Sequence, residues 1–252
     1  MAHLFRSSSP QNRYYAWFSA LHTRIDLLLL APLTEPEFEA VEEAVSAELL
    51  AVEKMGNRFD PNSELSRAVS AANENSLSNS PTPTPLSPAL FSLLSRCLRA
   101  NQETGGLFDI TINSPDFHPG LINAVELFPS PDNEGGFFHF HRDGLLLDLS
   151  GILKGYALER LRSLLPSFGI TDALVNLGNS SILSLGNNPS DIPSGHCLTT
   201  SGNESATRRH IRNPLTGEFI TGRRTISVTT SDAIEGEILS TVRFIQQSAN
   251  GC

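Results

Sequence analysis

Two short apolar segments joined by a short turn constrain the fold of this chain most. Residues 172–177 and 182–185 have the length and content of β-strands, and Gly178, Asn179 and Ser180 between them are turn residues. Strands linked this closely form hairpins rather than the strand–helix–strand units of a parallel sheet. Because helical segments are interspersed with such strands, we expect an α+β fold with a mixed or antiparallel sheet core and packed helices.

Hydrophobic periodicity and turn chemistry assign the remaining elements. We expect strands at residues 25–30 and 225–229, a β-hairpin over 137–149 that turns at 142–144, and helices over 35–56, 88–104, 151–165 and 232–245. Residues 58–67 have the composition of a loop, and residues 73–88, rich in Ser, Asn, Thr and Pro, that of an exposed connector. One domain spanning residues 1–252 is expected, with a flexible N-terminus over residues 1–15.

Charge and cysteine content exclude some classes of function. The net charge of −9 disfavours binding to a nucleic-acid backbone, which needs basic patches. It leaves a phosphate-bearing small molecule open, because a few cations and a metal can dominate one pocket. Cys97, Cys197 and Cys252 lack metal-ligand spacing, and Cys97 is expected to be a buried apolar residue of a helix. With neither a secretory signal nor a run long enough to span a bilayer, the sequence as it stands predicts a cytoplasmic protein.

A junction between a strand and a helix near residue 150 is the first candidate site. Asp148 ends a strand, Ser150 and Gly151 form the turn, and Lys154 lies in the first helical turn. The amide groups of a helix N-terminus bind anions, and a lysine there can meet a phosphate. The alternative is an ordinary tight turn with a solvated lysine.

A second candidate lies on the C-terminal helix. Glu237 and Thr241 are four residues apart, so they share one helix face. A carboxylate and a hydroxyl are oxygen ligands that suit Mg²⁺. Alternatively, Thr241 bonds within its own helix and Glu237 is solvated.

The histidines leave two further possibilities. His210 precedes an Asn-Pro turn and is either a general base or orienting donor, or a side chain satisfied by that turn. His139 and His141 alternate on a predicted strand and share a face, where a zinc pair is the alternative to an ordinary strand surface. His118 has no defined relation to them in the sequence.

Six segments, taken together and in order, resemble the FAD:protein FMN transferases (the ApbE-like family, also called thiamine-biosynthesis lipoproteins). The matching segments are residues 58–67, 104–111, 148–157, 173–178, 210–217 and 239–241. They extend over most of residues 55–245. The resemblance implies an ApbE-like fold and a Mg²⁺-dependent transfer of FMN from FAD to a Ser or Thr hydroxyl of an acceptor protein, with release of AMP.

The resemblance also implies roles for individual residues. Contacts to FAD are implied for Leu107, Phe108, Asp109, Asp148, Lys154 and the backbone near Ile211. Ligands of Mg²⁺ are implied for the carbonyl group of Gly151 and for Glu237, Thr241 and Ser240. His210 is the candidate base for the incoming hydroxyl. Family members are often exported and membrane-anchored, in contrast to the cytoplasmic location expected from this sequence alone.

Departures from the family pattern leave alternatives for function. Glu237 replaces the usual Asp, and Asn179 replaces a Gly, so Asn179 must adopt a backbone conformation that glycine favours. Two other functions are therefore considered. The first is a flavin- or nucleotide-binding module without turnover, and the second is a pyrophosphatase that splits FAD into FMN and AMP when water reaches the phosphorus.

Overall fold

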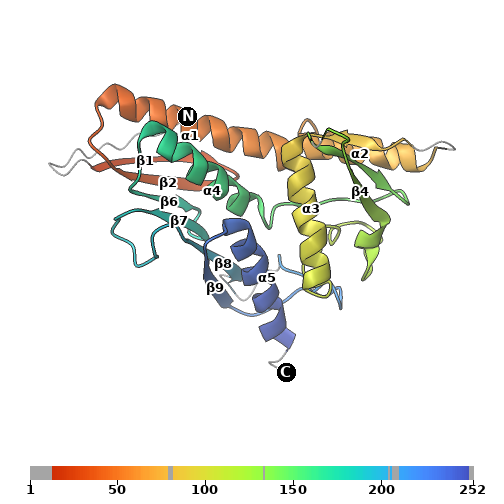
Figure 1. The fold of residues 1–252 in the computed structure, drawn as a ribbon. Coiled ribbons are helices and arrows are strands. Elements are labelled where there is room, and N and C mark those ends of the chain that lie inside the picture. The colour runs from red at the N-terminus through yellow and green to blue at the C-terminus, as the bar shows by residue number, and fades with distance from the viewer. Residues whose placement is uncertain (1–12, 79–81, 133, 204, 206–209, 250–252) are drawn as a thin grey trace. The chain divides into compact units, whose positions relative to one another are not determined.

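A computed structural model describes residues 13–78, 82–132, 134–203, 205 and 210–249 of the chain. It divides into two compact units. Figure 1 shows the helices and strands, coloured by residue number. Unit 1 takes its described residues from segments 1–53, 151–201 and 225–241. Unit 2 takes them from segments 54–150, 202–224 and 242–252. Each unit is therefore assembled from pieces that are far apart in the sequence.

Unit 1 is built on a six-stranded sheet with the strand order β1-β2-β6-β7-β8-β9. Its strands are β1 (Arg13–Ala20), β2 (Thr23–Leu30), β6 (Ala173–Leu177), β7 (Ser181–Leu185), β8 (Cys197–Asn203) and β9 (Arg224–Thr230). The helices are α1 (Glu35–Gly56), α4 (Leu153–Leu164), the short 3₁₀ helix η2 (Leu165–Phe168) and α5 (Ala233–Ala249), of which α1 and α5 continue into unit 2. Pairing is antiparallel from β1 through β8, and it includes the predicted hairpin, which is formed by β6 and β7.

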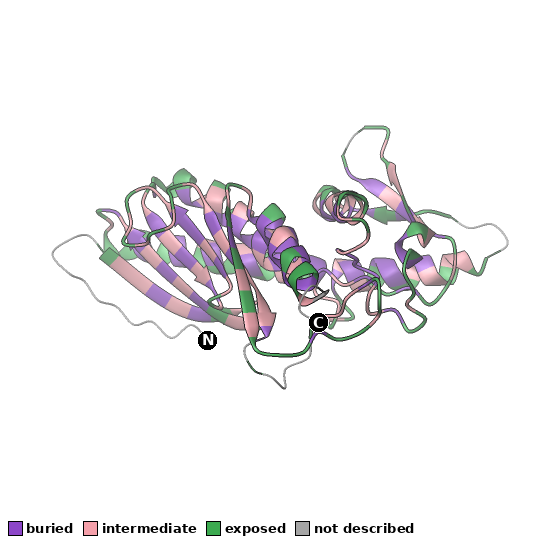
Figure 2. Cartoon of the chain, turned by 90° about the horizontal axis from the view of Figure 1, so that it is seen from below, coloured by how far each residue is buried: buried purple, intermediate pink, exposed green. Residues whose placement is uncertain are grey.

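One face of this sheet forms the core of unit 1. Buried and partly exposed residues alternate along the strands, which produces the stripes in Figure 2. Ile25, Leu27 and Leu29 of β2 are fully buried, and so are Ala173, Val175 and Leu177 of the neighbouring β6. The turn between β1 and β2 places Leu21 and His22 at positive φ, the backbone geometry that favours a two-residue hairpin.

Unit 2 contains a three-stranded sheet with the order β3-β5-β4. Its elements are α2 (Glu64–Ser76), β3 (Thr84–Leu86), α3 (Pro88–Glu103), the 3₁₀ helix η1 (Leu121–Ala124), β4 (Val125–Pro129) and β5 (Gly136–Phe140). Phe138 and Phe140 of β5 are fully buried and meet edge to face, with ring centroids 4.9 Å apart. Their aromatic pair anchors this sheet to the core of unit 2.

The α+β class and most of the expected elements are confirmed. The four expected helices correspond to α1, α3, α4 and α5, and the strands expected at 25–30, 172–177, 182–185 and 225–229 correspond to β2, β6, β7 and β9. Ser87 caps α3 through Leu90 N at 3.3 Å, with Pro88 in the first turn.

The hairpin expected over residues 137–149 is wrong in its second arm. β5 pairs with β4 and β3 instead. Residues 145–149 alternate between buried and exposed as a strand does, but their backbone bonds go elsewhere: Leu145 N to the side chain of Asn73, Leu146 N to the hydroxyl of Ser114, and Asp148 N to a loop carbonyl. Alternating burial therefore marked an extended segment that belongs to no sheet.

Two loop assignments also need correction. Within residues 58–67, helix α2 begins at Glu64, with Ser63 as its N-cap accepting a hydrogen bond from Ser66 N at 3.0 Å. The expected connector 73–88 contains the end of α2 and the strand β3, while residues 79–81 lie outside the described residues. At the N-terminus, residues 13–15 belong to β1, and residues 1–12 of the expected flexible segment are not among the described residues.

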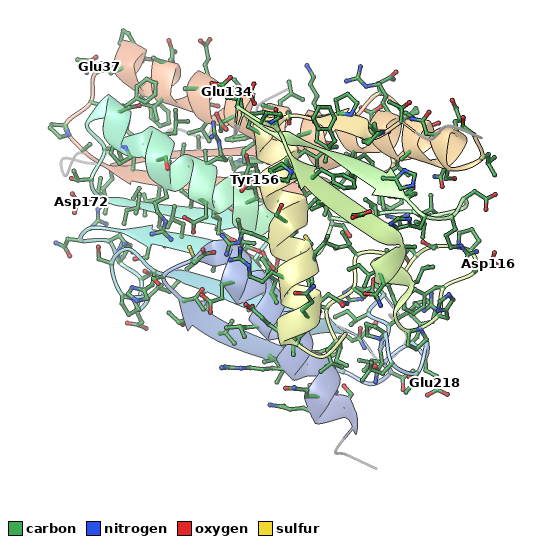
Figure 3. All side chains as sticks on the ribbon, turned by 45° about the vertical axis from the view of Figure 1, so that its right-hand side comes forward. Glu37, Asp116, Glu134, Tyr156, Asp172 and Glu218 are labelled. Carbon is green, nitrogen blue, oxygen red and sulfur yellow. The ribbon has the colours of Figure 1, made fainter. Side chains whose placement is uncertain are left out.

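Many acidic side chains lie at the surface, whereas Glu42, Asp109 and Glu237 are buried. Glu37 of unit 1 and Asp116 and Glu218 of unit 2 are all exposed, and Figure 3 shows these side chains on the ribbon. None of the helices in the described part of the chain combines the length and the apolar character needed to cross a bilayer.

Candidate functional site

In unit 1, the first turns of α4 and α5 lie against each other. A Cβ atom added to Gly155 of α4 would lie 2.6 Å from the carbonyl oxygen of Ala233 and 2.8 Å from Cγ of Glu237. Glycine at 155 is therefore what permits this approach, since any larger side chain would push α5 away. The approach brings Lys154, the neighbour of Gly155, into the same region as Glu237 on α5.

Two consecutive serines at the start of β7 bind the two charged side chains. The ammonium group of Lys154 donates to the hydroxyl of Ser180, and the hydroxyl of Ser181 donates to Oε1 of Glu237 at 2.5 Å. Asn179 just before them has φ of +60°, confirming the glycine-like backbone expected from the sequence. This turn thus directs both hydroxyl groups toward the helix starts.

Glu237 is a buried carboxyl group, only 5% exposed. Burial raises its pKa to about 7, while the charge of Lys154 and the hydrogen bond from Ser181 act in the opposite direction. Its side chain is therefore poised to change charge near neutral pH. The alternative of a solvated Glu237 is wrong, and Lys154, half-buried and bound to Ser180, is not the freely solvated lysine of an ordinary turn.

Ser240 and Thr241 complete a row of oxygen atoms on α5. Ser201 of β8 lies 2.8 Å from the hydroxyl of Ser240 and 2.9 Å from that of Thr241. Positions 237, 240 and 241 share one face of the helix, which follows from their spacing. We call Lys154, Ser180, Ser181, Ser201, Glu237, Ser240 and Thr241 the α4–α5 cluster. Gly151 lies in the turn that precedes α4 in the same unit.

The donor set of the α4–α5 cluster has the character of a hard-cation site. It offers one carboxylate and several hydroxyl groups, which are ligands that Mg²⁺ accepts. In the described part of the chain, no group of three or more His, Cys, Asp or Glu side chains is arranged to hold a metal ion. A cation in this unit would therefore rely on Glu237 together with neutral oxygen atoms.

Asp148 lies in unit 2 and is held by its neighbours there. Its Oδ2 accepts from Asn113 at 2.5 Å and lies 2.9 Å from Nε of Arg58, and its Oδ1 accepts from Ser150 N at 2.9 Å. Arg58 in turn stacks on the ring of Phe59 at 4.1 Å. The carboxylate is thus fixed in orientation two residues before the chain passes into unit 1.

A cavity of about 810 Å³ opens in unit 2 beside this carboxylate's partner Arg58. Its lining comes from the loop before α2, from one side of α2 and from the extended segment near Leu146. Phe59 is 68% exposed there and Leu146 is 39% exposed. Apolar surface of this kind suits a planar ring better than it suits water.

The segment 107–109 forms a tight loop after α3. Leu107 and Phe108 are bonded to Thr104 and Asn101, and Asp109 accepts from the amide and the hydroxyl of Thr111 at 2.8 and 2.6 Å. Burial raises the pKa of Asp109, and the two hydrogen bonds from Thr111 offset only part of this rise. The carboxylate of Asp109 is thus bonded to Thr111 within the loop and stabilises the loop's conformation.

His210 and Ile211 begin the last described segment of unit 2. His210 is exposed, and the carbonyl of Ile211 accepts from Ile220 N at 2.9 Å. The next residue, Arg212, donates to the carbonyl of Ile112 at 2.8 Å and so fastens this segment to the loop after Asp109. His139 and His141 are neighbours, with rings 5.0 Å apart, and His141 pairs with Glu126 at 2.9 Å.

Sequence reasoning missed the partners of the charged groups. Ser181 and Glu159 contact candidate residues or their helices, yet neither belongs to a recognisable motif. The sequence indicates Ser180 only as a turn residue. The sequence signal that could have identified Ser180 and Ser181 is their position: two adjacent serines between the Gly178–Asn179 turn and the next strand.

Comparison with known proteins gives one family match. The model of the ApbE family matches residues 21–116 and 121–252. A curated relative, the FAD:protein FMN transferase of Klebsiella pneumoniae (strain 342), is 25% identical over 244 residues, which covers 77% of this chain and 67% of the relative.

Solved structures share the fold. The flavin transferase ApbE from Vibrio cholerae superposes with a TM-score of 0.74 at 20% identity, covering 94% of this chain and 87% of that one. The ApbE protein from Thermotoga maritima gives 0.73 at 21% identity, with the same coverage. The apo flavinyl transferase ApbE from Pseudomonas stutzeri gives 0.70 at 17%, covering 97% of this chain and 88% of the other. The ApbE-like fold expected from the sequence is confirmed.

Proposed function

The chain belongs to the ApbE family, and from this membership we propose that it is an FAD:protein FMN transferase, with FAD as donor and another protein as acceptor. Support comes from the Klebsiella relative, which carries this activity in its name, and from neighbours named flavin transferases. The departures from the family pattern leave the fold intact.

The finer proposal concerns the bond that is exchanged. The oxygen of a Ser or Thr hydroxyl of the acceptor forms a bond to the phosphorus of the FMN half of FAD. The bond between this phosphorus and the oxygen that bridges to the AMP phosphorus breaks, and AMP leaves with that oxygen. The hydroxyl proton passes to a base, for which His210 is the candidate.

The convergence of Lys154 and Glu237 in unit 1 is the observation that carries this proposal. Charge develops on a pyrophosphate as its bridging bond breaks, and fixed cationic groups stabilise that charge. Lys154 is oriented by Ser180 at the N-terminus of α4, where the amide groups also favour an anion. Lys154 would accordingly bind the pyrophosphate of FAD.

Mg²⁺ is the cation that fits the oxygen atoms of the α4–α5 cluster. Glu237, Ser240, Thr241 and the carbonyl of Gly151 would hold it. When bound, Mg²⁺ supplies positive charge beside the pyrophosphate. Burial favours the neutral form of Glu237, so a bound cation has to displace its proton. Ser181 fixes one carboxylate oxygen and leaves the other for the cation.

Further contacts to FAD are proposed on the ground of the family resemblance. We assign these contacts to Leu107, Phe108, Asp109, Asp148 and the backbone of Ile211. The ordered state of Asp148 and Asp109 supports this assignment, because a preorganised polar group loses little entropy when it binds a ligand.

The test is release of AMP from FAD. Purified protein is incubated with FAD and Mg²⁺, with and without an acceptor peptide that contains Ser or Thr, and AMP and peptide-bound flavin are quantified. Transfer predicts AMP and flavinylated peptide in equal amounts, only when the acceptor is present. AMP without acceptor would indicate a pyrophosphatase, and FAD binding without AMP would indicate a binding module; either result overturns the proposal.

A further inference from the structure

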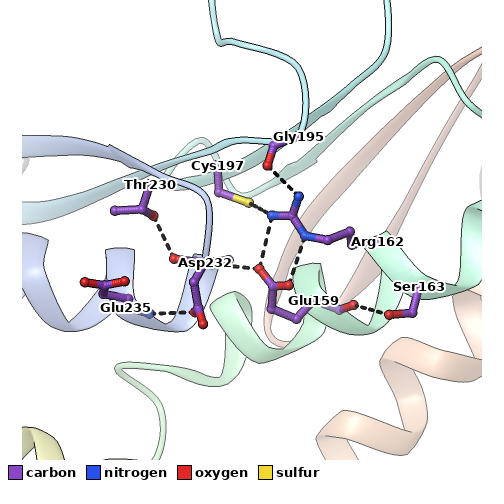
Figure 4. A network of polar contacts seen from close by, with 9 residues as sticks. Glu159, Arg162, Ser163, Gly195, Cys197, Thr230, Asp232 and Glu235 are labelled. Carbon is purple, nitrogen blue, oxygen red and sulfur yellow. Dashed lines mark hydrogen bonds and ion pairs between the residues drawn. The ribbon is translucent and has the colours of Figure 1, made fainter.

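A polar network joins α4 to the first turn of α5 (Figure 4). Oε1 of Glu159 on α4 accepts a hydrogen bond from the backbone N–H of Ala233 at 2.7 Å and one from Arg162 at 3.1 Å. Its Oε2 accepts from Nε of Arg162 at 2.9 Å. One carboxylate of α4 therefore bonds directly to the backbone of the helix that carries Glu237.

Arg162 anchors this carboxylate to the sheet. Its guanidinium group also donates to the carbonyl of Gly195 at 2.6 Å and to Sγ of Cys197, at the start of β8, at 3.1 Å. Burial raises the pKa of the Cys197 thiol to about 12, so the sulfur remains a neutral acceptor. The position of Glu159 is thus set by Arg162 of α4, which is bonded to Gly195 and Cys197 and not to α5.

The bond from Ala233 is not needed to begin α5. Asp232 caps this helix in the ordinary way, because its Oδ1 accepts from Glu235 N at 3.0 Å. The additional bond to Glu159 instead fixes where α5 lies along α4. Gly155, one helical turn before Glu159, provides the second contact between the same two helices, against the carbonyl of the same Ala233.

We infer that Glu159 is a positioning residue: by holding Ala233 it sets the register of α5 against α4, and with it the separation of Glu237 from Lys154. Glu237 lies one helical turn after Ala233, and Lys154 lies just over one turn before Glu159. A shift of α5 along α4 would move the carboxylate away from the ammonium group and from Ser181. The inference rests on the proposed function, in which Glu237 and Lys154 act in the same site.

The experiment compares three variants of the full chain. Glu159→Ala removes the hydrogen bond from Ala233 and the two from Arg162, and Glu159→Gln keeps an oxygen that can accept from Ala233. Arg160→Ala is the matched control, because Arg160 on the same helix bonds to Glu48 of α1 at 2.6 Å and leaves the Glu159 network in place. Circular dichroism establishes that each variant is folded. Binding of Mn²⁺, which favours the same oxygen ligands as Mg²⁺, is measured by its electron paramagnetic resonance signal.

Glu159→Ala is expected to weaken Mn²⁺ binding roughly tenfold or more, as loss of a residue that orients a ligand does. The value of kcat should fall with it, while KM for the acceptor changes little. Glu159→Gln should recover part of both losses, and Arg160→Ala should leave metal binding and kcat at the wild-type level. Wild-type Mn²⁺ affinity in Glu159→Ala would overturn the inference.

Hydrogen exchange of the α5 amide groups decides the inference without any ligand. Glu159→Ala should accelerate exchange in the first two turns of α5, and Arg160→Ala should not. Unchanged protection in Glu159→Ala would also overturn it. If the wild-type protein binds no Mn²⁺, the metal site of the proposed function is rejected. The hydrogen-exchange data then test the positioning role of Glu159 by themselves.

Discussion

The hydroxyl group of Ser181 donates a hydrogen bond to the buried carboxyl group of Glu237, which lies 56 residues later in the sequence. Ser181 is itself fully buried, so this bond has no competition from water. A hydrogen bond to a charged group in such surroundings contributes more than one between neutral groups.

Ser181→Ala should therefore destabilise the protein by about 1.5–3 kcal/mol and raise the pKa of Glu237 further above its usual value. Urea unfolding measures the first effect. Ser184→Ala is the matched control, because Ser184 is a buried serine of the same strand that bonds to the carbonyl of Ile192. Mg²⁺ affinity is measured for both variants. If Ser181→Ala and Ser184→Ala changed it equally, a specific role for Ser181 would be contradicted.

The metal-free protein should lose stability as pH rises through neutrality. The folded-state pKa of Glu237 is raised to about 7 from 4.5. A carboxyl group with a raised pKa contributes stability that is complete below its unfolded pKa and lost as pH rises through its folded pKa. We expect Tm to fall between about pH 5 and pH 7 and then to level off with respect to this group.

Glu237→Gln is neutral at every pH and should remove this part of the pH dependence. Addition of Mg²⁺ should restore Tm most strongly above pH 7 in the wild type, since the cation binds the charged carboxylate. A thermal shift series over this pH range measures both effects. A pH profile of Glu237→Gln identical to that of the wild type would exclude Glu237 as its source.

Lys154→Ala should weaken FAD binding by roughly tenfold to a hundredfold, the equivalent of one or two charge-assisted hydrogen bonds. The chain contains one other lysine, Lys54, which is exposed in the last turn of α1. Lys54→Ala removes the same charge and serves as the control. Fluorescence quenching of FAD gives both dissociation constants, and equal constants for the two variants would count against this pocket.

Gly178→Ala should destabilise unit 1 beyond the cost of its backbone conformation. Gly178 has φ of +65°, and an added Cβ would lie 2.1 Å from Oγ1 of Thr23. Gly169 has a similar φ of +73° but nothing within 4 Å of such a Cβ, so Gly169→Ala measures the backbone effect alone.

The difference in unfolding free energy between these two alanine variants reports the clash with Thr23. Thr23→Ala should relieve part of it, giving a non-additive double mutant. If the changes in unfolding free energy of Gly178→Ala and Thr23→Ala were strictly additive, a steric clash between an alanine at 178 and Thr23 would be excluded.

Much of the fold could be predicted where the spacing of hydrophobic residues and the capping residues at the ends of a helix indicate the same element. For α3, Ser87, Pro88 and the pattern of buried leucines all indicate one helix, and the structure confirms it. For α2 the same signals were present, since Ser63 caps a helix whose buried positions are Leu65, Ala68, Val69 and Ala72. The turn-rich residues before Ser63 obscured them.

The mistaken hairpin has a different cause. Residues 145–149 alternate correctly for a strand, but sequence cannot show which groups satisfy their backbone. The side chain of Asn73 both accepts from Leu145 N and donates to its carbonyl, and so replaces a strand partner from 72 residues away. The strands β1, β3, β4 and β8 are not among the expected elements, although β1 contains the run Tyr14–Phe18, whose aromatic residues are typical of a strand.

For the site, the charged residues could be predicted and their surroundings could not. Glu237 and Lys154 were identified from helix-start patterns and a family resemblance. That Glu237 is buried, and therefore titrates near neutrality, depends on Gly155 and on the packing of α5. Such burial results from tertiary contact, to which local sequence gives no direct guide.

The contact between Thr23 and Gly178 has a practical consequence for engineering the chain. A short turn between antiparallel strands is ordinarily an attractive place to insert a tag or a new loop. The β1–β2 turn is a poor choice here, because extra length next to Thr23 would displace Gly178 and, beyond it, the serines that bind Lys154 and Glu237. Gly144, with nothing within 4 Å of where a side chain would start, marks a more tolerant position for such an insertion.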